Sequence, residues 1–426
     1  MAAQNTNVIS NQPVIASEER AKQSALSKPT KQSLVPALRF KEFEGGIRET
    51  SFGKLYSFHT TNSFSRAKLN YDKGIVRNIH YGDIHTKFQS HFYLESECVP
   101  FINEDVDLSK VKEESYCKVG DIIIADASED YADIGKSIEL LDLNNEKILA
   151  GLHTFLARPI SGKTAVGFMS YLLKSWKLRK QIMTIAQGTK VLSLSTRRVS
   201  KLKLNLPSLP EQQKIAAFLS AVDQKIQQLT QKKALLEDYK KGVMQQLFSG
   251  KLRFKDDDGN DYPDWEEKRL GDILTIGSGR DYKHLSQGDI PVYGTGGYMT
   301  SVSEYLFDGD SVGIGRKGTI DKPVFLSGKF WTVDTLFYTH SFKEVLPFFI
   351  YLKFQSINWK LYNEASGVPS LSKSTIEKIK IEIPSLPEQQ KIASFLSSID
   401  AKIEQVNQQL NQTQTFKKGL LQQMFV

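Results

Sequence analysis

Apolar residues recur at alternating intervals of four and three in two long stretches of the chain. The first stretch contains Ile215, Leu219, Val222, Ile226 and Leu229, and the pattern continues through Leu236, Val243 and Leu247. The second contains Ile392, Leu396, Ile399, Ile403 and Val406, and continues through Leu410, Leu420 and Met424. This spacing predicts the narrow heptad seam of a coiled coil rather than the wider face of a globular helix. Each helix could span about 39 residues, or roughly 58 Å.

The two stretches are copies of one sequence. Residues 202–248 align with residues 379–425 at a constant offset of 177, without a gap, and 25 of the 47 aligned pairs are identical. Ten identities are consecutive, from Pro207 to Ala216. Two equivalent modules in one chain pack most economically about a pseudo-two-fold axis. We therefore expect the two helices to run antiparallel. Each helix follows a segment whose sequence differs between the two copies, and we expect this variable domain to lie at one end of the pair.

Each predicted helix begins with the same proline-containing element. Ser208 with Glu211, and Ser385 with Glu388, have the spacing of a capping box, in which the serine oxygen accepts from the backbone three residues on and the glutamate reaches back. Pro210 and Pro387 lie in the first turn, where no amide hydrogen is needed.

Two polar residues interrupt the seam toward the C-terminal end of each helix. They are Lys233 and Lys240 in the first helix, and Thr413 and Lys417 in the second. One interpretation is that these ends leave the helix pair and become solvated. The other is that the polar residues fix the register and the number of partners, at some loss of stability. The sequence leaves both open.

The pattern predicts an α+β protein with a pseudo-two-fold internal repeat, in which two globular α/β domains are separated by two long antiparallel coiled-coil helices. Looser similarity upstream of the helices supports this, since Leu38–Phe40 recurs as Leu252–Phe254. The expected domains are a flexible N-terminal arm (1–35), a first variable domain (36–201), a central helix (202–250), a second variable domain (251–378) and a C-terminal helix (379–426).

Composition narrows the possible partners only a little. The chain has 56 Lys and Arg against 48 Asp and Glu, a net charge of +8, which permits nucleic acid or an acidic surface as a partner. The two cysteines, Cys98 and Cys117, belong to no metal or redox motif. No apolar run is long enough to span a membrane, and no signal peptide is evident, so we expect a cytoplasmic protein.

Enzyme motifs are absent or incomplete. Gly313–Gly318 matches GxGxxG, but a turn and a strand containing Pro323 follow it instead of the helix that a dinucleotide site requires. Residues 157–164 resemble a phosphate-binding loop, yet Ala157 stands where the first glycine belongs. We expect no catalytic residue and no metal site in this chain.

The repeated PSLPEQQKIA, with its continuations FLSAVDQKI and FLSSIDAKI, resembles the DNA-specificity subunit of type I restriction–modification enzymes. The resemblance covers about residues 40–426. It implies that each variable domain recognises one half of a bipartite, asymmetric site in double-stranded DNA. Segments 121–130 with 134–136, and 315–320 with 330–335, are similar to two common types of recognition domain.

The resemblance also implies partners. The paired helices would set the distance between the half-sites and dock two methyltransferase subunits, to which restriction and translocase subunits add. The repeated helix starts would serve capping and docking through Ser208, Pro210, Glu211, Gln212, Gln213, Ser385, Pro387, Glu388, Gln389 and Gln390. Since no Pro-Pro pair occurs, the chain lacks the (N/D)PP(Y/F) element of adenine methyltransferases. S-adenosylmethionine, ATP and Mg²⁺ are accordingly expected on partner subunits.

Base and phosphate contacts need basic, amide and aromatic side chains on exposed loops. In the first variable domain the candidates are Arg66, Lys68, Asn70, Tyr71, Lys73, Arg77, Asn78, His80, Tyr81, His85, Lys87 and Lys190. In the second they are Ser278, Arg280, Tyr282, Lys283, His284, Tyr293, Thr295, Arg316 and Lys317. The alternative function is a coiled-coil adaptor that binds two protein partners without touching DNA. The matching basic and aromatic content of both variable domains argues against it.

Overall fold

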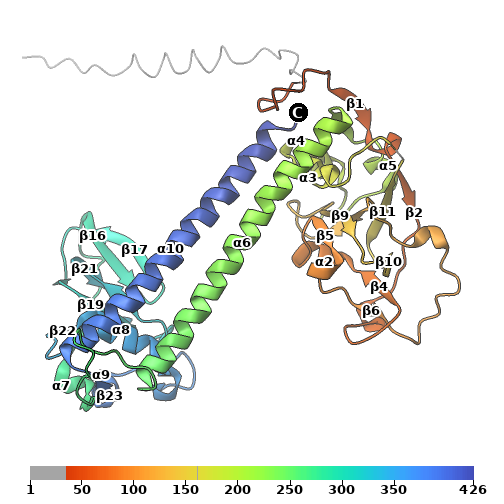
Figure 1. Cartoon of the computed structure of the whole chain (residues 1–426). Coiled ribbons are helices and arrows are strands. Elements are labelled where there is room, and N and C mark those ends of the chain that lie inside the picture. Colours follow the sequence, from red (N-terminus) through yellow and green to blue (C-terminus); the bar gives the residue numbers. More distant parts are fainter. Residues whose placement is uncertain (1–34, 161) are drawn as a thin grey trace, which may run out of the picture. The chain divides into compact units, whose positions relative to one another are not determined.

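The computed structural model describes residues 35–160 and 162–426, so residues 1–34 of the predicted arm lie outside it. The chain divides into two compact units, which we describe separately. The first comprises residues up to Lys225 together with Thr413–Val426, and the second comprises Ile226–Gln412. Two long helices, α6 (Leu209–Phe248) and α10 (Leu386–Gln423), contribute to both units (Figure 1).

The first unit is built on two mixed sheets whose strands are mostly short. The larger sheet has the order β2-β11-β7-β9-β5, with β2 (Tyr56–His59), β11 (Thr154–Pro159), β7 (Ile122–Ala125), β9 (Ser137–Asp142) and β5 (His91–Tyr93). The smaller has the order β10-β4-β6-β3, with β10 (Lys147–Ala150), β4 (Val76–Ile79), β6 (Phe101–Ile102) and β3 (Leu69–Asn70). The four residues of β7 are all buried, as expected for a continuous apolar strand between two others.

Among the described residues of the first unit, four shorter α-helices and short pairs of strands complete the fold. The helices are α2 (Tyr81–Thr86), α3 (Phe168–Lys174), α4 (Trp176–Ile185) and α5 (Thr196–Val199). Single turns of 3₁₀ helix occur at η1 (Phe52–Lys54), η2 (Arg66–Lys68), η3 (Leu94–Ser96) and η4 (Glu113–Ser115). The short strand β8 (Ala127–Ser128) pairs with β12 (Leu192–Ser193) and joins two loops that lie far apart in the sequence.

The second unit has a different sheet arrangement. One four-stranded sheet has the order β15-β22-β19-β20, with β15 (Thr275–Ser278), β22 (Leu336–His340), β19 (Ser311–Gly315) and β20 (Val324–Leu326). The other has the order β17-β16-β21-β18, with β17 (Gly297–Val302), β16 (Gln287–Gly294), β21 (Lys329–Thr332) and β18 (Phe307–Asp308). The helices are α7 (Leu270–Ile273), α8 (Pro347–Ser356), η5 (Trp359–Tyr362) and α9 (Lys373–Lys378).

Each variable domain begins and ends on one small antiparallel sheet. In the first unit β1 (Arg48–Ser51) pairs with β13 (Lys203–Leu206), and in the second β14 (Glu266–Arg269) pairs with β23 (Lys380–Ile383). The first residue of the entry strand is opposite the last residue of the exit strand in both cases. The exit strand then leads directly into the long helix, so this sheet positions the domain relative to the helix that follows it.

The residues of the predicted seam pack in two different environments. In the second unit, Leu229, Val406 and Leu410 are buried against each other, with Ile226 and Leu236 packed at the edge. Residues nearer the helix ends instead join the core of the globular part, as Val243, Leu247, Ile392, Leu396 and Ile399 do. The same stripe therefore binds helix to helix in its middle and helix to sheet domain at its end.

The polar seam residues form cross-helix contacts. In the second unit the Lys240 ammonium donates to both carboxylate oxygens of Asp400 at 2.6 and 2.8 Å, and Lys233 donates to Asn407 at 3.1 Å. The residue on α10 decreases in number as that on α6 increases, so the helices run antiparallel here. In the first unit Lys417 forms an ion pair with Asp223.

The two ion pairs are equivalent positions of the repeat, since Asp223 and Lys240 lie 177 residues before Asp400 and Lys417. For Lys240 and Lys417, the structure favours the register-fixing interpretation over solvation. Asp223 also accepts from the Tyr171 hydroxyl of α3 at 2.8 Å, which ties the helix pair to the sheet domain.

The repeated glutamate at each helix start is buried in an ion pair with a distant arginine. Arg39 donates to Glu211 from Nε and Nη2, both at 2.7 Å. Arg253 donates to Glu388 at 3.2 and 2.8 Å, and Trp265 Nε1 donates to the same carboxylate at 3.1 Å. The arginines belong to the repeated Leu-Arg-Phe, so this short motif holds the segment that enters each domain against the helix that leaves it.

The repeated glutamine is buried as well, and its amide joins the helix start to the domain. Gln212 accepts from the Ala165 amide at 3.0 Å and donates to the Pro207 carbonyl at 3.0 Å. Gln389 accepts from the Leu346 amide at 2.9 Å and donates to the Pro384 carbonyl at 2.8 Å. Ala165 and Leu346 precede α3 and α8, so the same residue fixes the corresponding helix in both units.

The predicted capping boxes are wrong. The Ser385 hydroxyl is buried and has no hydrogen-bond partner among the described residues. Glu211 and Glu388 bond to arginine instead of reaching back to the serine amide. Buried side chains of this kind present no surface for docking, so the predicted docking role does not fit Glu211, Gln212, Glu388 and Gln389. Gln213 and Gln390 are exposed, and their predicted role is untested.

Over the described residues, no helix combines the length and apolar character needed to cross a membrane, and no group of three or more His, Cys, Asp or Glu side chains is placed to hold a metal ion.

We predict that Arg253→Met destabilises the chain by about 3 kcal/mol, because it leaves the buried Glu388 carboxylate without its cation. Lys391→Met provides the control. Lys391 lies one turn after Glu388 on α10 and pairs with the almost fully exposed Asp257, so its loss should cost much less than that of Arg253. Urea unfolding measures both. Equal losses in the two variants would contradict a structural role for the buried pair.

We also predict measurable coupling between Lys240 and Asp400. Lys240→Ala and Asp400→Ala should each lower the free energy of unfolding, and the double-mutant cycle should give a coupling of about 0.5–1 kcal/mol, because Asp400 is partly solvated. The equivalent cycle at Asp223 and Lys417 should give a similar value. Zero coupling in both cycles would mean that the ion pairs do not fix the register.

Candidate nucleic-acid interface

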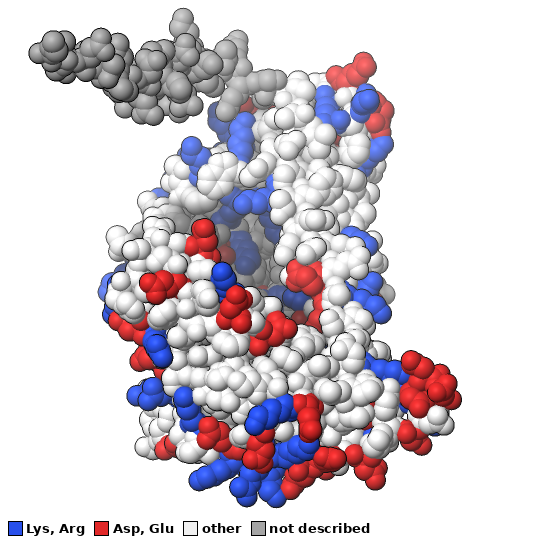
Figure 2. All heavy atoms as spheres, turned by 90° about the vertical axis from the view of Figure 1, so that its left-hand side faces the viewer, with Lys and Arg blue, Asp and Glu red and all other residues white. Residues whose placement is uncertain are grey.

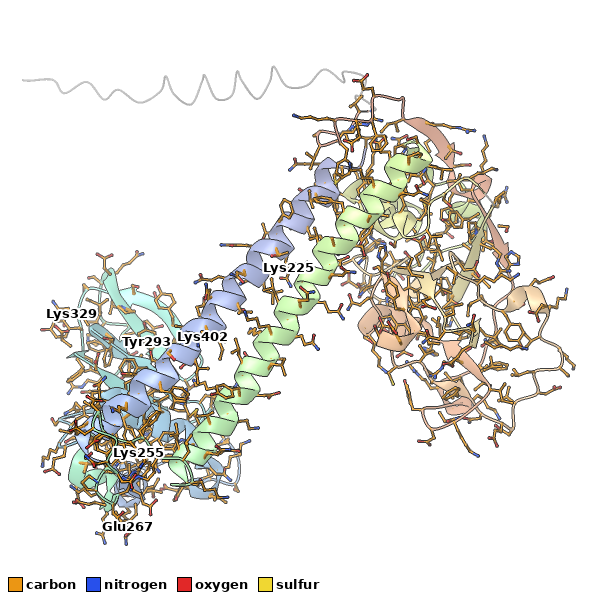
Figure 3. The ribbon with its side chains drawn as sticks, viewed as in Figure 1. Lys225, Lys255, Glu267, Tyr293, Lys329 and Lys402 are labelled. Carbon is orange, nitrogen blue, oxygen red and sulfur yellow. The ribbon has the colours of Figure 1, made fainter. Side chains whose placement is uncertain are left out.

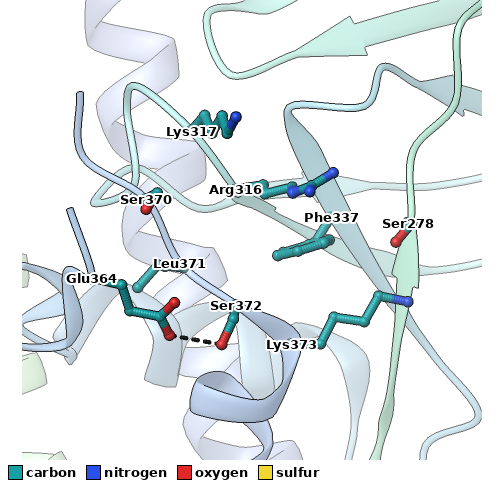
Figure 4. A pocket seen from close by; sticks show the side chains of 9 residues that line it. All are labelled: Ser278, Arg316, Lys317, Phe337, Glu364, Ser370, Leu371, Ser372 and Lys373. Carbon is teal, nitrogen blue, oxygen red and sulfur yellow. Dashed lines mark hydrogen bonds between the residues drawn. The ribbon is translucent and has the colours of Figure 1, made fainter. Parts of the chain in front are cut away.

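The second unit contains a basic surface pocket of about 390 Å³. It lies where three segments meet: the end of β15 at Ser278, the turn after β19 with Arg316 and Lys317, and the loop that leads into α9 (Figure 4). That loop contributes Ser370, Leu371, Ser372 and Lys373, and Phe337 and Glu364 complete the lining. The structure therefore brings together Ser278, Arg316 and Lys317, three of the predicted DNA contacts.

Backbone contacts hold the turn that carries the two cations. The Leu371 amide donates to the Arg316 carbonyl at 2.9 Å, and the Gly318 amide donates to the Pro369 carbonyl at 2.8 Å. Gly315 is required here, because a Cβ atom would lie 2.0 Å from the Thr319 carbonyl oxygen. The GxGxxG match is thus a strand and a tight turn that present Arg316 and Lys317 to solvent, in agreement with the sequence interpretation.

Positive charge dominates the pocket. The Arg316 guanidinium lies 5.9 Å and the Lys373 ammonium 6.0 Å from the centre of the Phe337 ring (Figure 4). The Glu364 carboxylate accepts from the Thr375 and Ser372 hydroxyls, and these bonds lower its pKa, so it stays ionised at neutral pH. Because Glu364 is held by hydroxyls, the three cations remain available for a phosphate or for the O6 and N7 atoms of guanine.

The neighbouring sheet adds aromatic side chains. Tyr293 of β16, labelled in Figure 3, is on one side of the Thr295–Gly296 turn. Tyr298 of β17 is on the other side, and the two ring centroids lie 6.4 Å apart. Tyr298 and the adjacent Met299 are exposed. Arg280, Lys283 and His284 are exposed on the loop after β15. Tyr282, in contrast, packs against the core around Val292 and Trp331.

Sequence reasoning missed Lys373, Phe337, Glu364 and Tyr298. Lys373 directly follows a Ser-Leu-Ser at 370–372 that also occurs at 193–195, and this repeat was the one available signal. Figure 2 shows one face of the molecule, on which Lys and Arg are interspersed with Asp and Glu rather than forming a field of one sign. Local groups such as the pocket are therefore the relevant units of charge.

In the first unit, the basic residues gather around a buried acid. Arg66 donates to Asp83 at 2.7 Å, and the Lys87 ammonium lies 3.1 Å from the same carboxylate oxygen. Both cations also donate to the Tyr71 hydroxyl, at 3.3 and 3.2 Å. Burial alone would raise the pKa of Asp83, but the bonds from Arg66 and Lys87 outweigh it and lower this pKa. The group is ordered, keeps one net positive charge, and exposes Arg66, Tyr71 and Lys87.

Two predicted contacts of the first unit are wrong because their side chains are buried. Asn78 accepts from the Asn62 amide at 2.7 Å inside the domain. His80 accepts from the Gly82 amide at 3.1 Å and caps α2, and burial lowers the pKa of its imidazole. Neither residue reaches the surface that a duplex would contact.

The remaining first-unit candidates are engaged to different degrees. Arg77 bonds to Glu146 and lies 4.0 Å over the Phe101 ring. Lys68 pairs with Asp105 and Lys73 with Glu104 at exposed positions. Asn70 donates to Asn103 and accepts from the Asp72 amide, and Tyr81 packs between the rings of His85 and His153. His85 Nε2 lies 3.0 Å from the Ala127 carbonyl oxygen, and Lys190 is exposed on the loop before β12.

A family model, the type I restriction modification DNA specificity domain, matches residues 85–238 and 262–414. The two matches begin 177 residues apart, which is the offset of the helix repeat. Each match spans most of one variable domain and more than half of the helix that follows it.

Curated relatives are named as specificity subunits of type I restriction enzymes. The putative type I restriction enzyme MjaX specificity subunit of Methanocaldococcus jannaschii is 26% identical over 341 residues, which are 73% of this chain and 80% of the relative. The MjaVIII specificity subunit of the same organism is 25% identical over 293 residues, which are 59% of this chain and 68% of the relative.

Solved structures share the fold. The S subunit of a type I restriction–modification system from M. genitalium superposes with a TM-score of 0.58 at 16% identity, over 92% of this chain and 99% of that one. A chain from a study of complex assembly and conformational transition of the type I R-M system gives 0.53 at 13% identity, over 90% and 98%. With both variable domains matched, the chain belongs to the family of type I restriction–modification DNA specificity subunits.

Proposed function

We propose that each unit recognises one half of a bipartite site in double-stranded DNA and that the chain itself catalyses no reaction. The pocket at Arg316, Lys317 and Lys373 is the observation that carries the proposal, because it presents three cations with a single, already engaged acid. Arg66, Tyr71 and Lys87 form the corresponding group in the first unit. Methyl transfer, with its S-adenosylmethionine, and ATP and Mg²⁺ chemistry would belong to partner subunits.

The two half-sites should differ in sequence. The first unit has a five-stranded and a four-stranded main sheet, whereas the second has two four-stranded sheets. Their exposed groups differ as well. The first unit has Arg66 and Lys87 bonded to Tyr71, whereas the second has Arg316 and Lys317 on a turn. Domains with different loops and different side chains make different base contacts, so an asymmetric site is expected.

We further propose that α6 and α10 set the distance between the half-sites. The equivalent ion pairs at Lys240–Asp400 and Lys417–Asp223 support this, because a register fixed at two places resists sliding of one helix along the other. The buried Glu388–Arg253 and Glu211–Arg39 pairs support it too, since each fixes a domain to the start of its helix.

The helices also offer two equivalent docking positions. Tyr239 on α6 is 53% exposed and Phe416 on α10 is 54% exposed, and the two lie 177 residues apart in the repeat. Exposed aromatic side chains are frequent anchors of protein interfaces. Two matching anchors suit two copies of one partner, so we propose that each docks one methyltransferase subunit.

Replacing Arg316 and Lys317 by alanine should weaken duplex binding about 5- to 150-fold, because a guanine contact from one such side chain contributes about 1–3 kcal/mol. The variant should lose its discrimination between bases in one half-site only. Lys255→Gln is the control, since Lys255 lies outside the pocket in the same unit and pairs with an exposed acid (Figure 3). Anisotropy titration of the complex, with all single-base variants of its duplex, measures both effects.

The result also separates DNA recognition from the adaptor alternative. If the double variant binds every duplex as the unsubstituted chain does, the pocket has no part in DNA recognition, and a protein-binding role for this unit gains support.

Tyr239→Ala and Phe416→Ala should each remove one methyltransferase subunit from the assembly, and the double variant should remove both. Loss of an interface anchor costs about 2 kcal/mol or more, a roughly 30-fold drop in affinity. Native mass spectrometry of the complex gives the stoichiometry directly. Thr230→Ala, also exposed on α6, should leave it unchanged. Retention of two subunits by the double variant would contradict the assignment.

A further inference from the structure

A second basic groove lies in the first unit, along one side of α4. Its volume is about 810 Å³. We define the α4 groove by Trp176, Lys177 and Lys180 of α4 and by Arg198, Lys201 and Lys203 of the segment from α5 to β13. None of these six residues was among the DNA contacts expected from the sequence, so the groove has no assigned role in the function proposed above.

The charge of the α4 groove is largely uncompensated. Five cations line it, and Glu49 is the one acid of its lining. Glu49 lies 3.7 Å from Lys203, in a pair whose members are both mostly exposed. Arg198 donates to the Ile185 carbonyl at 3.3 Å and keeps its charge. Lys177, Lys180 and Lys201 pair with no acid of the described part of the chain, so the groove attracts an anionic ligand.

Trp176 gives the groove an exposed aromatic face. It is the first residue of α4, and 64% of its surface is exposed. The other three tryptophans are shielded: Trp331 and Trp359 are buried, and Trp265 is half-buried and bonded to Glu388. Trp176 follows α3, and in the second unit Trp359 follows α8, the counterpart of α3, and donates to the Phe354 carbonyl at 2.8 Å. The repeat therefore does not require an exposed indole at Trp176.

An acidic protein surface and a single-stranded nucleic acid could each bind to positive charge beside an aromatic ring. Protein interfaces are depleted in lysine, and four of the five cations here are lysines. Grooves for single-stranded nucleic acid, in contrast, combine lysine and arginine along the backbone with aromatic side chains on which bases stack. Along a B-form duplex the base faces are covered by neighbouring bases, so an indole gains little there.

We propose that the α4 groove binds single-stranded nucleic acid, with an unpaired base stacked on Trp176 and phosphates held by the surrounding lysines. The site is separate from the recognition groups around Arg66 and Arg316. Its test does not depend on duplex recognition, so failure of one proposal leaves the other standing.

Intrinsic fluorescence provides the first test, because Trp176 is the most accessible of the four indoles. The full chain is titrated with a short oligothymidylate, with a duplex of equal length that lacks the recognised site, and with polyglutamate. The oligothymidylate should quench the emission, with an affinity that falls as salt rises. Trp176→Phe should abolish the quenching.

Anisotropy of a labelled oligothymidylate tests the contacts separately. Trp176→Ala should lower the affinity about 5- to 150-fold, the range for loss of one stacked base. Lys177→Gln with Lys180→Gln should reduce the slope of log affinity against log salt by about 1.4, since each phosphate contact to a single strand contributes about 0.7.

The matched control is Lys225→Gln with Lys402→Gln. These two lysines are exposed on α6 and α10, respectively (Figure 3), occupy equivalent positions of the repeat, and lie outside the groove. The control should leave both affinity and salt slope unchanged. Three results would overturn the proposal: quenching by the duplex equal to that by the single strand, quenching by polyglutamate alone, or a salt slope that the groove lysines do not change.

Discussion

The buried ion pair at the start of each long helix is the contact on which the rest of this structure depends. Glu388 is removed from solvent, and Arg253 and Trp265 together compensate its charge. A carboxylate in this position is destabilising unless a cation accompanies it, so the segment that carries Arg253 must return to the helix. Glu211 and Arg39 impose the same closure on the first unit. The candidate groups around Arg66 and Arg316 both stand on domains fixed in this way, and this gives their side chains a defined position.

The two long helices and their repeat could be predicted from the sequence alone. Spacing of four and three marks the apolar stripe without any knowledge of tertiary structure, and the equivalent ion pairs occupy positions that the repeat already identified. The capping boxes failed for a physical reason. A serine and a glutamate three residues apart satisfy a local rule, but Arg39 lies 172 residues before Glu211, and its charge outweighs a weak local bond. No local pattern contains that arginine.

The candidate DNA-contacting groups could be predicted only in part. Arg316 and Lys317 follow a glycine that must lie close to another backbone, and such turns place their side chains at the surface. Asn78 and His80 have the residue types of base contacts, yet Asn78 Oδ1 and His80 Nδ1 accept hydrogen bonds inside the first unit. Residue type does not distinguish these outcomes, because amides and imidazoles serve buried backbone as readily as they serve a base. Lys373 joins the pocket only through folding of the loop that precedes α9.

The small sheets β1–β13 and β14–β23 have a consequence for how such a protein changes over time. Because entry and exit strands are hydrogen-bonded neighbours, everything between them is an insertion that both begins and ends at one place. A different insertion that ends in the same two strands would meet the same helix start. The ten identical residues that follow each exit strand give both insertions the same helix start. The sheet that orders each domain thus also makes it a self-contained insertion, whose replacement would leave the helices unchanged.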